Sequence, residues 1–243
     1  MNRFWILCCT VLIYTIWSCQ NKPSPPPPEP PRNSQVDSIQ LPEQKPAPNP
    51  IRIDYDTLQW QELRETASRI LDFRYATENN FLKQAVYPCG RCFLRPAAAK
   101  ALGEAEKYLE KQGLGLILYD CYRPRPVQFR MWEILPDKRY VSDPNKGSMH
   151  NRGLAVDLGL IDTQGKVLDM GTDFDYFGPE AWHEYRNLDT VILANRALLK
   201  TTMERYGFRP IRTEWWHYSY QGSGGGLDEF VWSCPEMVKK AQK

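Results

Sequence analysis

The sequence is poor in histidine, has no excess of charge of one sign, and lacks an apolar run long enough for a comfortable membrane span. Its 243 residues include three histidines, His150, His183 and His217. Lys and Arg total 31, Asp and Glu total 29, and the two signs are interspersed. Because no basic stripe is present, we set nucleic acid aside as a partner. The length allows one large domain or two small ones.

The longest apolar run lies at the amino terminus. Arg3 precedes the run from Phe4 to Trp17, which is the layout of a secretory signal peptide. A membrane-spanning helix needs about 20 apolar residues, so the run is too short for a comfortable span. It ends in Ile-Trp-Ser-Cys at Cys19, which resembles the lipobox of bacterial lipoproteins. We expect a signal peptide over residues 1–18 and a lipid on Cys19, with an ordinary signal peptide or an uncleaved anchor as the alternative. The expected location is periplasmic, with the lipid in the outer membrane.

A proline-rich segment follows Cys19. Residues 21–50 contain eleven of the twenty prolines and almost no large apolar side chain. Such a composition cannot bury a core, so residues 19–50 are expected to be a disordered tether. At about 3.1 Å per residue, a polyproline-like tether would reach on the order of 90 Å. A folded domain over residues 51–243 would then work at some distance from a membrane.

Export would place the cysteines of the domain in an oxidising compartment, where disulfides can form. Outside the signal peptide and the lipid site, the domain has an even number of cysteines: Cys89, Cys92, Cys121 and Cys234. In an oxidising compartment this predicts two disulfides, with three possible pairings. The alternative is that the single CxxC forms half of a zinc knuckle or a redox pair. The sequence contains no second CxxC and no thioredoxin-like context, which favours a structural role.

Apolar periodicity, prolines and glycines predict a mixture of helices and strands. Pro96 and Gly113 delimit the clearest helix, and Asp189 precedes another that Gly207 ends. Helices are expected at 58–73, 97–112, 126–135 and 190–206, with a short one at the end holding Cys234. Strands are expected at 114–120, 154–160 and 214–220.

Two segments far apart in the chain carry the residues of a metal site. Residues 148–157 read Ser-Met-His-Asn-Arg-Gly-Leu-Ala-Val-Asp, and residues 214–217 read Glu-Trp-Trp-His. A catalytic zinc takes three protein ligands and leaves a fourth position for water. His150, Asp157 and His217 would be those ligands. The alternative for either histidine is a core residue bonded in the interior.

Glu214 remains free as the base for that water. Glu214 and His217, three residues apart, would point to opposite faces of a regular strand, so the prediction requires a bend or a strand start near Glu214. Gly153 would let the chain turn so that His150 folds back toward Asp157. Arg123 follows the strand at 114–120, where it can face a site; the alternative is a surface arginine paired with Asp120 or Glu133.

Together with Arg123, these segments resemble the D-alanyl-D-alanine dipeptidases, the family that includes the vancomycin-resistance enzyme VanX. Further motifs of the resemblance are Arg-Tyr-Ala-Thr at 74–77, Asn-Phe at 80–81, Phe-Leu-Arg at 93–95, Tyr-Arg-Pro at 122–124 and Met-Gly-x-x-Phe-Asp at 170–175. The resemblance runs from about Asp72 to Tyr220. It implies an α+β fold of the Hedgehog and D,D-peptidase type, with a central, mostly antiparallel sheet flanked by helices.

The resemblance also implies roles for individual residues. It implies one Zn²⁺ per chain, Glu214 as acid and base, and Arg123 as the partner of the transition-state oxyanion. The substrate-binding residues that it implies are Ser148 near the carboxylate, Asp175 near the ammonium, Tyr75 and Trp215, with Tyr87 in the pocket wall. The paired cysteines and the tether depart from the cytoplasmic members of the family.

The expected function is zinc-dependent hydrolysis of D-alanyl-D-alanine in peptidoglycan turnover, by a zinc catalytic domain over residues 51–243. One alternative is a D,D-carboxypeptidase or endopeptidase acting on longer peptidoglycan peptides. Another is a zinc-stabilised binding module without turnover, as on the Hedgehog branch. A closed pocket with Asp175 at the amine end would favour the dipeptidase, and an open groove the longer substrates. Other divalent ions suit the same ligands, and the oligomeric state stays open.

Overall fold

The computed structural model describes residues 53–223 and 225–234. The chain divides into two units, residues 1–50 and 51–243, of which only the second is described. The predicted signal peptide, Cys19 and the tether lie outside the described residues. None of the helices in the described ranges has the length and apolarity that a membrane crossing requires.

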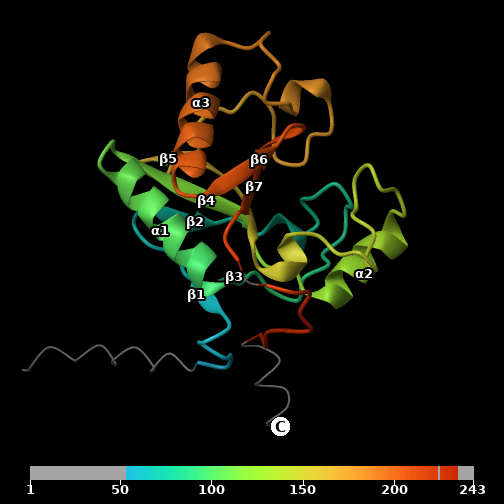
Figure 1. The fold of residues 1–243 in the computed structure, drawn as a ribbon. Helices are drawn as coiled ribbons and strands as arrows, with labels where there is room; N and C mark the ends of the chain where they lie inside the picture. The colour runs from blue at the N-terminus through green and yellow to red at the C-terminus, as the bar shows by residue number, and fades with distance from the viewer. Residues whose placement is uncertain (1–52, 224, 235–243) are drawn as a thin grey trace, which may run out of the picture. The chain divides into compact units, whose positions relative to one another are not determined.

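A five-stranded sheet forms the centre of the domain (Figure 1). Only its first two strands, β2 and β4, pair in parallel; the other neighbours are antiparallel, as predicted. A second, two-stranded antiparallel sheet pairs β1 with β3. In sheet order the strands are β2 (Arg69–Leu71), β4 (Leu114–Asp120), β5 (Ala155–Asp162), β7 (Glu214–Tyr220) and β6 (Phe208–Ile211), with β1 (Gln61–Leu63) and β3 (Cys92–Leu94) in the second sheet.

Two of the three helices in the described ranges pack beside each other on the sheet. Helix α1 (Pro96–Glu110) contacts β4, helix α3 (Thr190–Arg205) contacts β5, β6 and β7, and the two helices contact each other. Helix α2 (Arg125–Ile134) lies apart from both (Figure 1). Three short 3-10 turns complete the elements: η1 (Arg74–Ala76), η2 (His150–Arg152) and η3 (Pro179–Ala181). The predicted α+β class is confirmed.

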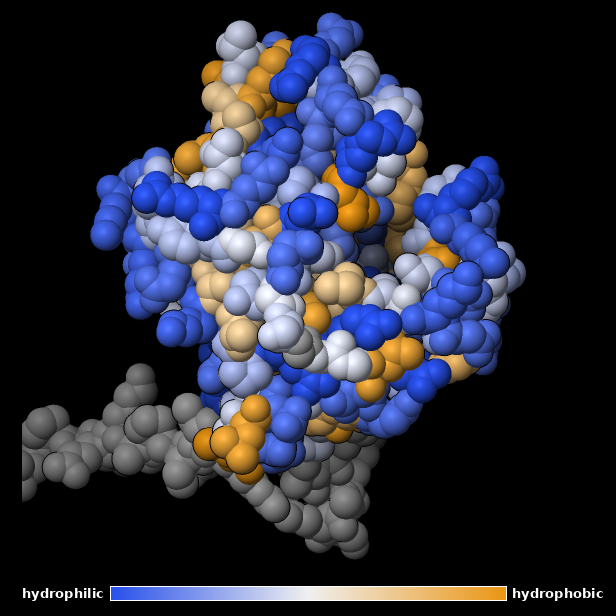
Figure 2. Space-filling model, viewed as in Figure 1, coloured by the Kyte–Doolittle hydropathy of each residue, from blue (hydrophilic) through white to orange (hydrophobic). Residues whose placement is uncertain are grey.

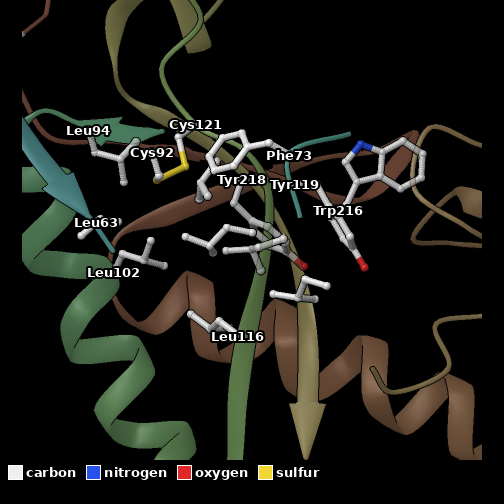
Figure 3. Packing of buried hydrophobic residues seen from close by; sticks show 14 of the residues in the cluster. Leu63, Phe73, Cys92, Leu94, Leu102, Leu116, Tyr119, Cys121, Trp216 and Tyr218 are labelled. Atoms are coloured by element: carbon white, nitrogen blue, oxygen red, sulfur yellow. A yellow bond between two sulfur atoms is a disulfide. The ribbon is translucent and has the colours of Figure 1, made fainter. Parts of the chain in front are cut away.

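The core lies between the sheet and the helices α1 and α3. Alternate residues of β4 and β5, such as Leu116 and Leu158, are fully buried, as are Leu102 of α1 and Leu199 of α3. Figure 3 shows Leu63, Leu102 and Leu116 in this layer, near the disulfide of Cys92 and Cys121. Each such leucine contributes about 1.5–3 kcal/mol by leaving water. The opposite face of β5 is therefore free to carry polar chemistry.

The predicted helix at 58–73 is wrong. This segment forms β1, a turn and β2, because Ile70 pairs with Ile117 of β4 and Leu63 with Cys92 of β3. Long-range strand pairing here overrides an apolar spacing that suits a helix. The expected terminal helix, with Cys234 near its start, falls mainly on residues 235–243, which lie outside the description. The other predicted elements agree with the structure to within about two residues, a usual uncertainty of element ends.

Candidate metal centre and active site

Strand pairing places three polar side chains in a row across the sheet. Asp157 of β5 is paired with His217 of β7 on one side and with Asp120 of β4 on the other. The register of β4 shifts between Leu118 and Asp120, so that Asp120 comes opposite Asp157. Directly paired residues present their side chains on the same face of a sheet. The row therefore brings two carboxylates and an imidazole together.

His150 reaches this row from the turn η2, which ends at Gly153. Gly153 has a φ of 70°, and a Cβ atom on it would lie 2.4 Å from Cζ3 of Trp60. Its carbonyl oxygen accepts a hydrogen bond from the backbone N–H of Arg95 at 2.9 Å. A side chain at this position would both strain the backbone and collide with Trp60. The glycine thus permits the turn that returns His150 to the sheet, as its position in the sequence predicts.

The atoms of His150, Asp157 and His217 converge. His150 Nε2 lies 3.2 Å from His217 Nδ1 and 3.3 Å from Asp157 Oδ2, and His217 Nδ1 lies 2.9 Å from Asp157 Oδ1. All three side chains are buried. Ligand atoms at about 2.0–2.1 Å from one tetrahedral zinc lie roughly 3.3 Å apart, which agrees with these distances. The structure thus brings the three predicted ligands within reach of one ion.

The second nitrogen of each imidazole sets the direction of the ligand nitrogen. His150 Nδ1 lies 2.7 Å from the carbonyl oxygen of Cys121, which can only accept a hydrogen bond. His217 Nε2 lies 3.0 Å from Oγ of Ser219. With protons on these atoms, both imidazoles point a lone pair at the carboxylate of Asp157. Three electron-rich groups in so small a space repel one another unless a cation lies between them, so the residues fit a divalent metal.

The electrostatics of the cluster favour a positive charge beside Asp157. Burial acts to raise the pKa of Asp157, but the imidazoles of His150 and His217 outweigh it and hold this pKa below its usual value. Burial acts to lower the pKa of His150, and the carboxylates of Asp157 and Asp120 raise it instead. Asp157 is therefore an anion at neutral pH and stabilises positive charge beside it.

Glu214 is the first residue of β7, and the pairing of β7 with β6 is irregular there. Ile211 is paired with Glu214, but the preceding Pro210 is paired with Tyr218, so residues 215–217 have no partner on β6. This irregularity is the departure from a regular strand that the prediction required. The side chain of Glu214 is mostly buried, and burial raises its pKa above the usual 4.5. Its carboxylate is thus a stronger base than that of an exposed glutamate.

Arg123 lies just beyond β4 and is buried. Its Nε and Nη2 donate to one carboxylate oxygen of Asp120 at 3.1 and 2.6 Å, and its Nη1 donates to Gln128 at 3.1 Å. Asp120 also accepts from the hydroxyl of Tyr87 at 2.7 Å. The alternative of a surface arginine is wrong, although its suggested partner Asp120 is correct. Pairing with Asp120 holds a permanent positive charge in the interior.

Asp120 is a site residue that sequence reasoning missed. Its side chain is fully buried, and its Oδ2 lies 3.6 Å from Nδ1 of His150 in addition to its bonds with Arg123. The signal that could have identified it is a carboxylate ending an apolar strand three residues before an arginine. Asp120 connects the arginine to a metal-site histidine.

Asp175 occupies a strained turn beside Tyr75. Its φ is 60°, a value found otherwise only at Lys83 among the described non-glycine residues. Its carboxylate accepts a hydrogen bond from the hydroxyl of Tyr75 at 2.8 Å. Burial, with the negative charge of Asp157 nearby, holds the pKa of Asp175 well above its usual value. Strain and an unfavourable charge at one residue are typical of a binding position.

Ser148 and Trp215, the other predicted substrate-binding residues, differ in their placement. The backbone N–H and the hydroxyl of Ser148 donate to Asn151, and the amide of Asn151 donates to the carbonyl oxygen of Arg123 at 2.8 Å. Trp215 instead donates to Oγ1 of Thr172 at 2.8 Å and lines a separate cleft of about 410 Å³. No residue of the metal cluster lines that cleft. Trp215 thus bonds the loop that carries Asp175, and its contact with the substrate stays a prediction.

The structure pairs all four cysteines of the domain. Cys92 is bonded to Cys121, and Cys89 to Cys234. The first disulfide joins β3 to the residue whose carbonyl oxygen lies against His150. The second joins the loop before β3 to the last described segment. One of the three pairings that the sequence left open is thereby selected.

An α+β fold with a buried His-Asp-His cluster, a partly buried glutamate at a strand start and a buried arginine defines a metallopeptidase. A family model described as D-ala-D-ala dipeptidase matches residues 60–234. The chain belongs to this family, as the motifs of its sequence predict.

Individual relatives agree with this membership. The chain is 37% identical over 148 residues to the D-alanyl-D-alanine dipeptidase of Escherichia coli, covering 61% of this chain and 77% of the relative. It is 34% identical over 169 residues to the D-alanyl-D-alanine dipeptidase of Enterococcus faecalis, covering 60% and 83%. A solved structure, the vancomycin resistance D,D-dipeptidase VanXYg with a D-Ala-D-Ala phosphinate analogue, is 23% identical, with a TM-score of 0.36 and coverage of 54% and 51%. So low a TM-score adds nothing to the family assignment.

Proposed function

We propose that this chain is a zinc-dependent D-alanyl-D-alanine dipeptidase that releases two D-alanines. One zinc ion would be held by His150, Asp157 and His217. The observation that carries the proposal is the convergence of their ligand atoms within 4.8 Å of one another in a buried position. When bound, zinc lowers the pKa of water to about 7 and polarises the scissile carbonyl.

Glu214 moves the protons of the reaction. Its carboxylate accepts a proton from the attacking water and then delivers it to the leaving amine. The raised pKa of Glu214 supports the first step, because a carboxylate of higher pKa is the stronger base. No other carboxylate of the cluster is free for this role, since Asp157 faces the two imidazoles and Asp120 bonds Arg123.

Arg123 stabilises the negative charge that develops on the carbonyl oxygen. Its guanidinium stays protonated, because Asp120 raises its pKa despite burial. Bonds to Asp120 and Gln128 fix the plane of the group, so it needs little reorganisation during the reaction. Loss of one such donor typically lowers the rate roughly a hundredfold or more.

The two ends of the dipeptide would meet opposite groups. Asp175, with the hydroxyl of Tyr75 on its carboxylate, would pair with the ammonium. Ser148 would contact the carboxylate; its hydroxyl donates to Asn151, which in turn donates to the backbone of Arg123. A buried carboxylate of raised pKa gains most from a cation, so an acylated amine would be a poor ligand for Asp175. This charge preference at Asp175 favours a free dipeptide over a longer peptide as the substrate.

We also propose that the protein is exported and anchored by a lipid on Cys19 in the outer membrane, where it would act on fragments from peptidoglycan turnover. The two disulfides of the domain support export, because disulfides persist in oxidising compartments. Partition of the full chain and of a Cys19→Ser variant between detergent and water tests the anchor. Equal partition of the two chains would contradict it.

The activity is tested with the purified chain, loaded with zinc or stripped by a chelator. We expect release of D-alanine from D-Ala-D-Ala, loss of that release with chelator, and recovery on adding zinc. N-acylated D-Ala-D-Ala and longer muropeptides should react poorly. Preferred cleavage of the longer peptides would favour the carboxypeptidase alternative, and metal binding without cleavage of any peptide would favour the binding module.

A further inference from the structure

Three aromatic side chains form a bridge between loops outside the described site. Phe81 and Phe177 pack edge to face with ring centroids 5.1 Å apart, and Phe177 packs against Tyr140 at 4.7 Å. We call Phe81, Tyr140 and Phe177 the aromatic bridge. Phe81 follows η1, Tyr140 follows α2, and Phe177 lies in the long loop after β5. The bridge therefore joins three loops that are separate in sequence.

The bridge continues a row of contacts that begins at the reaction site. The guanidinium of Arg123 lies 5.2 Å from the ring centre of Tyr75, and the Tyr75 ring packs against Phe81 at 6.1 Å. Exposure rises along this row, from 2% at Tyr75 to 38% at Phe177 and 37% at Tyr140. The bridge is thus the outer end of a wall whose inner end is Arg123.

Asp175 connects this wall to the amino end of the substrate. Asp175 is two residues before Phe177 in the same loop, and its carboxylate accepts a hydrogen bond from the hydroxyl of Tyr75. An ammonium paired with Asp175 therefore lies near Tyr75. A group attached to that nitrogen and extending along the row from Tyr75 would meet Phe81 and then Phe177.

Phe81 packs against the hydrophobic core, whereas Tyr140 and Phe177 are exposed. Neither Phe177 nor Tyr140 belongs to a helix or a strand. On the face shown in Figure 2, hydrophilic residues cover most of the surface and the hydrophobic ones form small patches. A small aromatic cluster at a site entrance therefore differs from an extended docking surface.

We infer that the aromatic bridge sets substrate length by closing the amino end of the pocket. The inference rests on the proposed dipeptidase function and names the residues that would exclude longer peptides. Asp175 selects for a free ammonium by charge, and the bridge excludes an added residue by its bulk. The two effects are separable, because truncating the bridge leaves the Asp175 carboxylate and its bond from Tyr75 in place.

The test compares two substrates in bridge variants of the zinc-loaded chain. The variants are Tyr140→Ala and Phe177→Ala, with Tyr140→Phe as a conservative replacement. Phe129→Ala is the matched control, since Phe129 is 39% exposed on α2 and lies outside the bridge. The substrates are D-Ala-D-Ala and the tripeptide L-Lys-D-Ala-D-Ala. We expect either alanine variant to raise the tripeptide-to-dipeptide ratio of kcat/KM by about tenfold or more, as removal of one blocking contact does.

Tyr140→Phe and Phe129→Ala should keep the wild-type ratio. An unchanged ratio in the folded alanine variants would overturn the inference, as would a wild type that already cleaves both peptides equally well. Tyr140→Ala truncates a partly exposed side chain, so it serves if Phe177→Ala does not fold. Selectivity can also be measured without turnover. Calorimetry gives the affinity of both peptides for zinc-loaded Glu214→Gln chains, with and without Tyr140→Ala. A wild type that cleaves neither peptide refutes the proposed function, whereas the binding ratio still decides the role of the bridge.

Discussion

The imidazole of His150 donates its Nδ1 proton to the carbonyl oxygen of Cys121 at 2.7 Å, and Cys121 is bonded to Cys92. The orientation of a metal-site histidine thus depends on a residue that a disulfide holds in place. Groups that orient a ligand in this way typically change metal affinity by about 10- to 100-fold when removed. We therefore expect metal binding by this chain to depend on an oxidised domain.

Replacing both Cys92 and Cys121 by alanine should weaken zinc binding by about 10- to 100-fold. It should also lower the free energy of unfolding by roughly 3 kcal/mol, because a loop of 29 residues is no longer closed. Chelator competition measures the affinity, and denaturant unfolding of the metal-free chain measures the stability. The control replaces Cys89 and Cys234, which should lower stability but keep zinc affinity. Equal zinc affinity in the two variants would show that the Cys92–Cys121 disulfide does not position the backbone carbonyl that His150 contacts.

Glu214→Gln should retain zinc and lose kcat by about 10²- to 10⁴-fold, because the amide cannot accept a proton. In the wild type, kcat/KM should fall as pH falls through the pKa of Glu214, which burial holds above 4.5. The sign follows from the mechanism, since only the ionised carboxylate is a base. Metal analysis and a pH profile check both parts. Loss of zinc together with activity would identify Glu214 as a ligand.

Asp120→Asn keeps the shape of the side chain but leaves the buried charge of Arg123 unpaired. Breaking a buried ion pair in this way costs about 3–5 kcal/mol. We expect a lower melting temperature and a kcat below that of the wild type. Arg123→Met in the same chain should recover part of the stability but none of the activity. Additive losses in the double variant would mean that the two residues act independently.

Arg196 of α3 bonds the backbone on both sides of Asp175 in the loop after β5. Its Nε donates to the carbonyl oxygen of Met170 at 2.6 Å and its Nη1 to that of Trp182 at 3.3 Å, and no ion pair joins it to a carboxylate of the described residues. A lysine reaches only one carbonyl, so Arg196→Lys should raise KM for D-Ala-D-Ala by roughly tenfold. Zinc content should not change. A fall in kcat with an unchanged KM would show that Arg196 does not act through substrate binding at Asp175.

His183, the third histidine, should make stability depend on pH. Burial first, with the charges of Lys200 and Arg196, lowers its pKa from 6.5 to about 4. The unfolded chain therefore binds a proton before the folded chain does, and stability is lost as pH falls from 6.5 toward about 4. His183→Gln should flatten this part of the curve of melting temperature against pH. A variant with the wild-type slope would assign the effect to other groups.

Local patterns in the sequence were sufficient for most elements and for the candidate ligands. Pro96 and Gly113 bracket α1, and alternation over residues 154–160 predicts β5, because propensity and periodicity act over a few neighbouring residues. The identity of His150, Asp157 and His217 followed from residue types that a metal requires. The helix expected at 58–73 failed because strand partners more than twenty residues away decide that segment.

Sequence by itself determined which side chains can bind a metal, move a proton and carry a permanent charge. Tertiary structure decided how they meet: the shift in β4 that sets Asp120 opposite Asp157, the irregular start of β7 at Glu214, and the pairing of the cysteines. These features depend on register and packing between distant segments, and no local pattern in the chain encodes them.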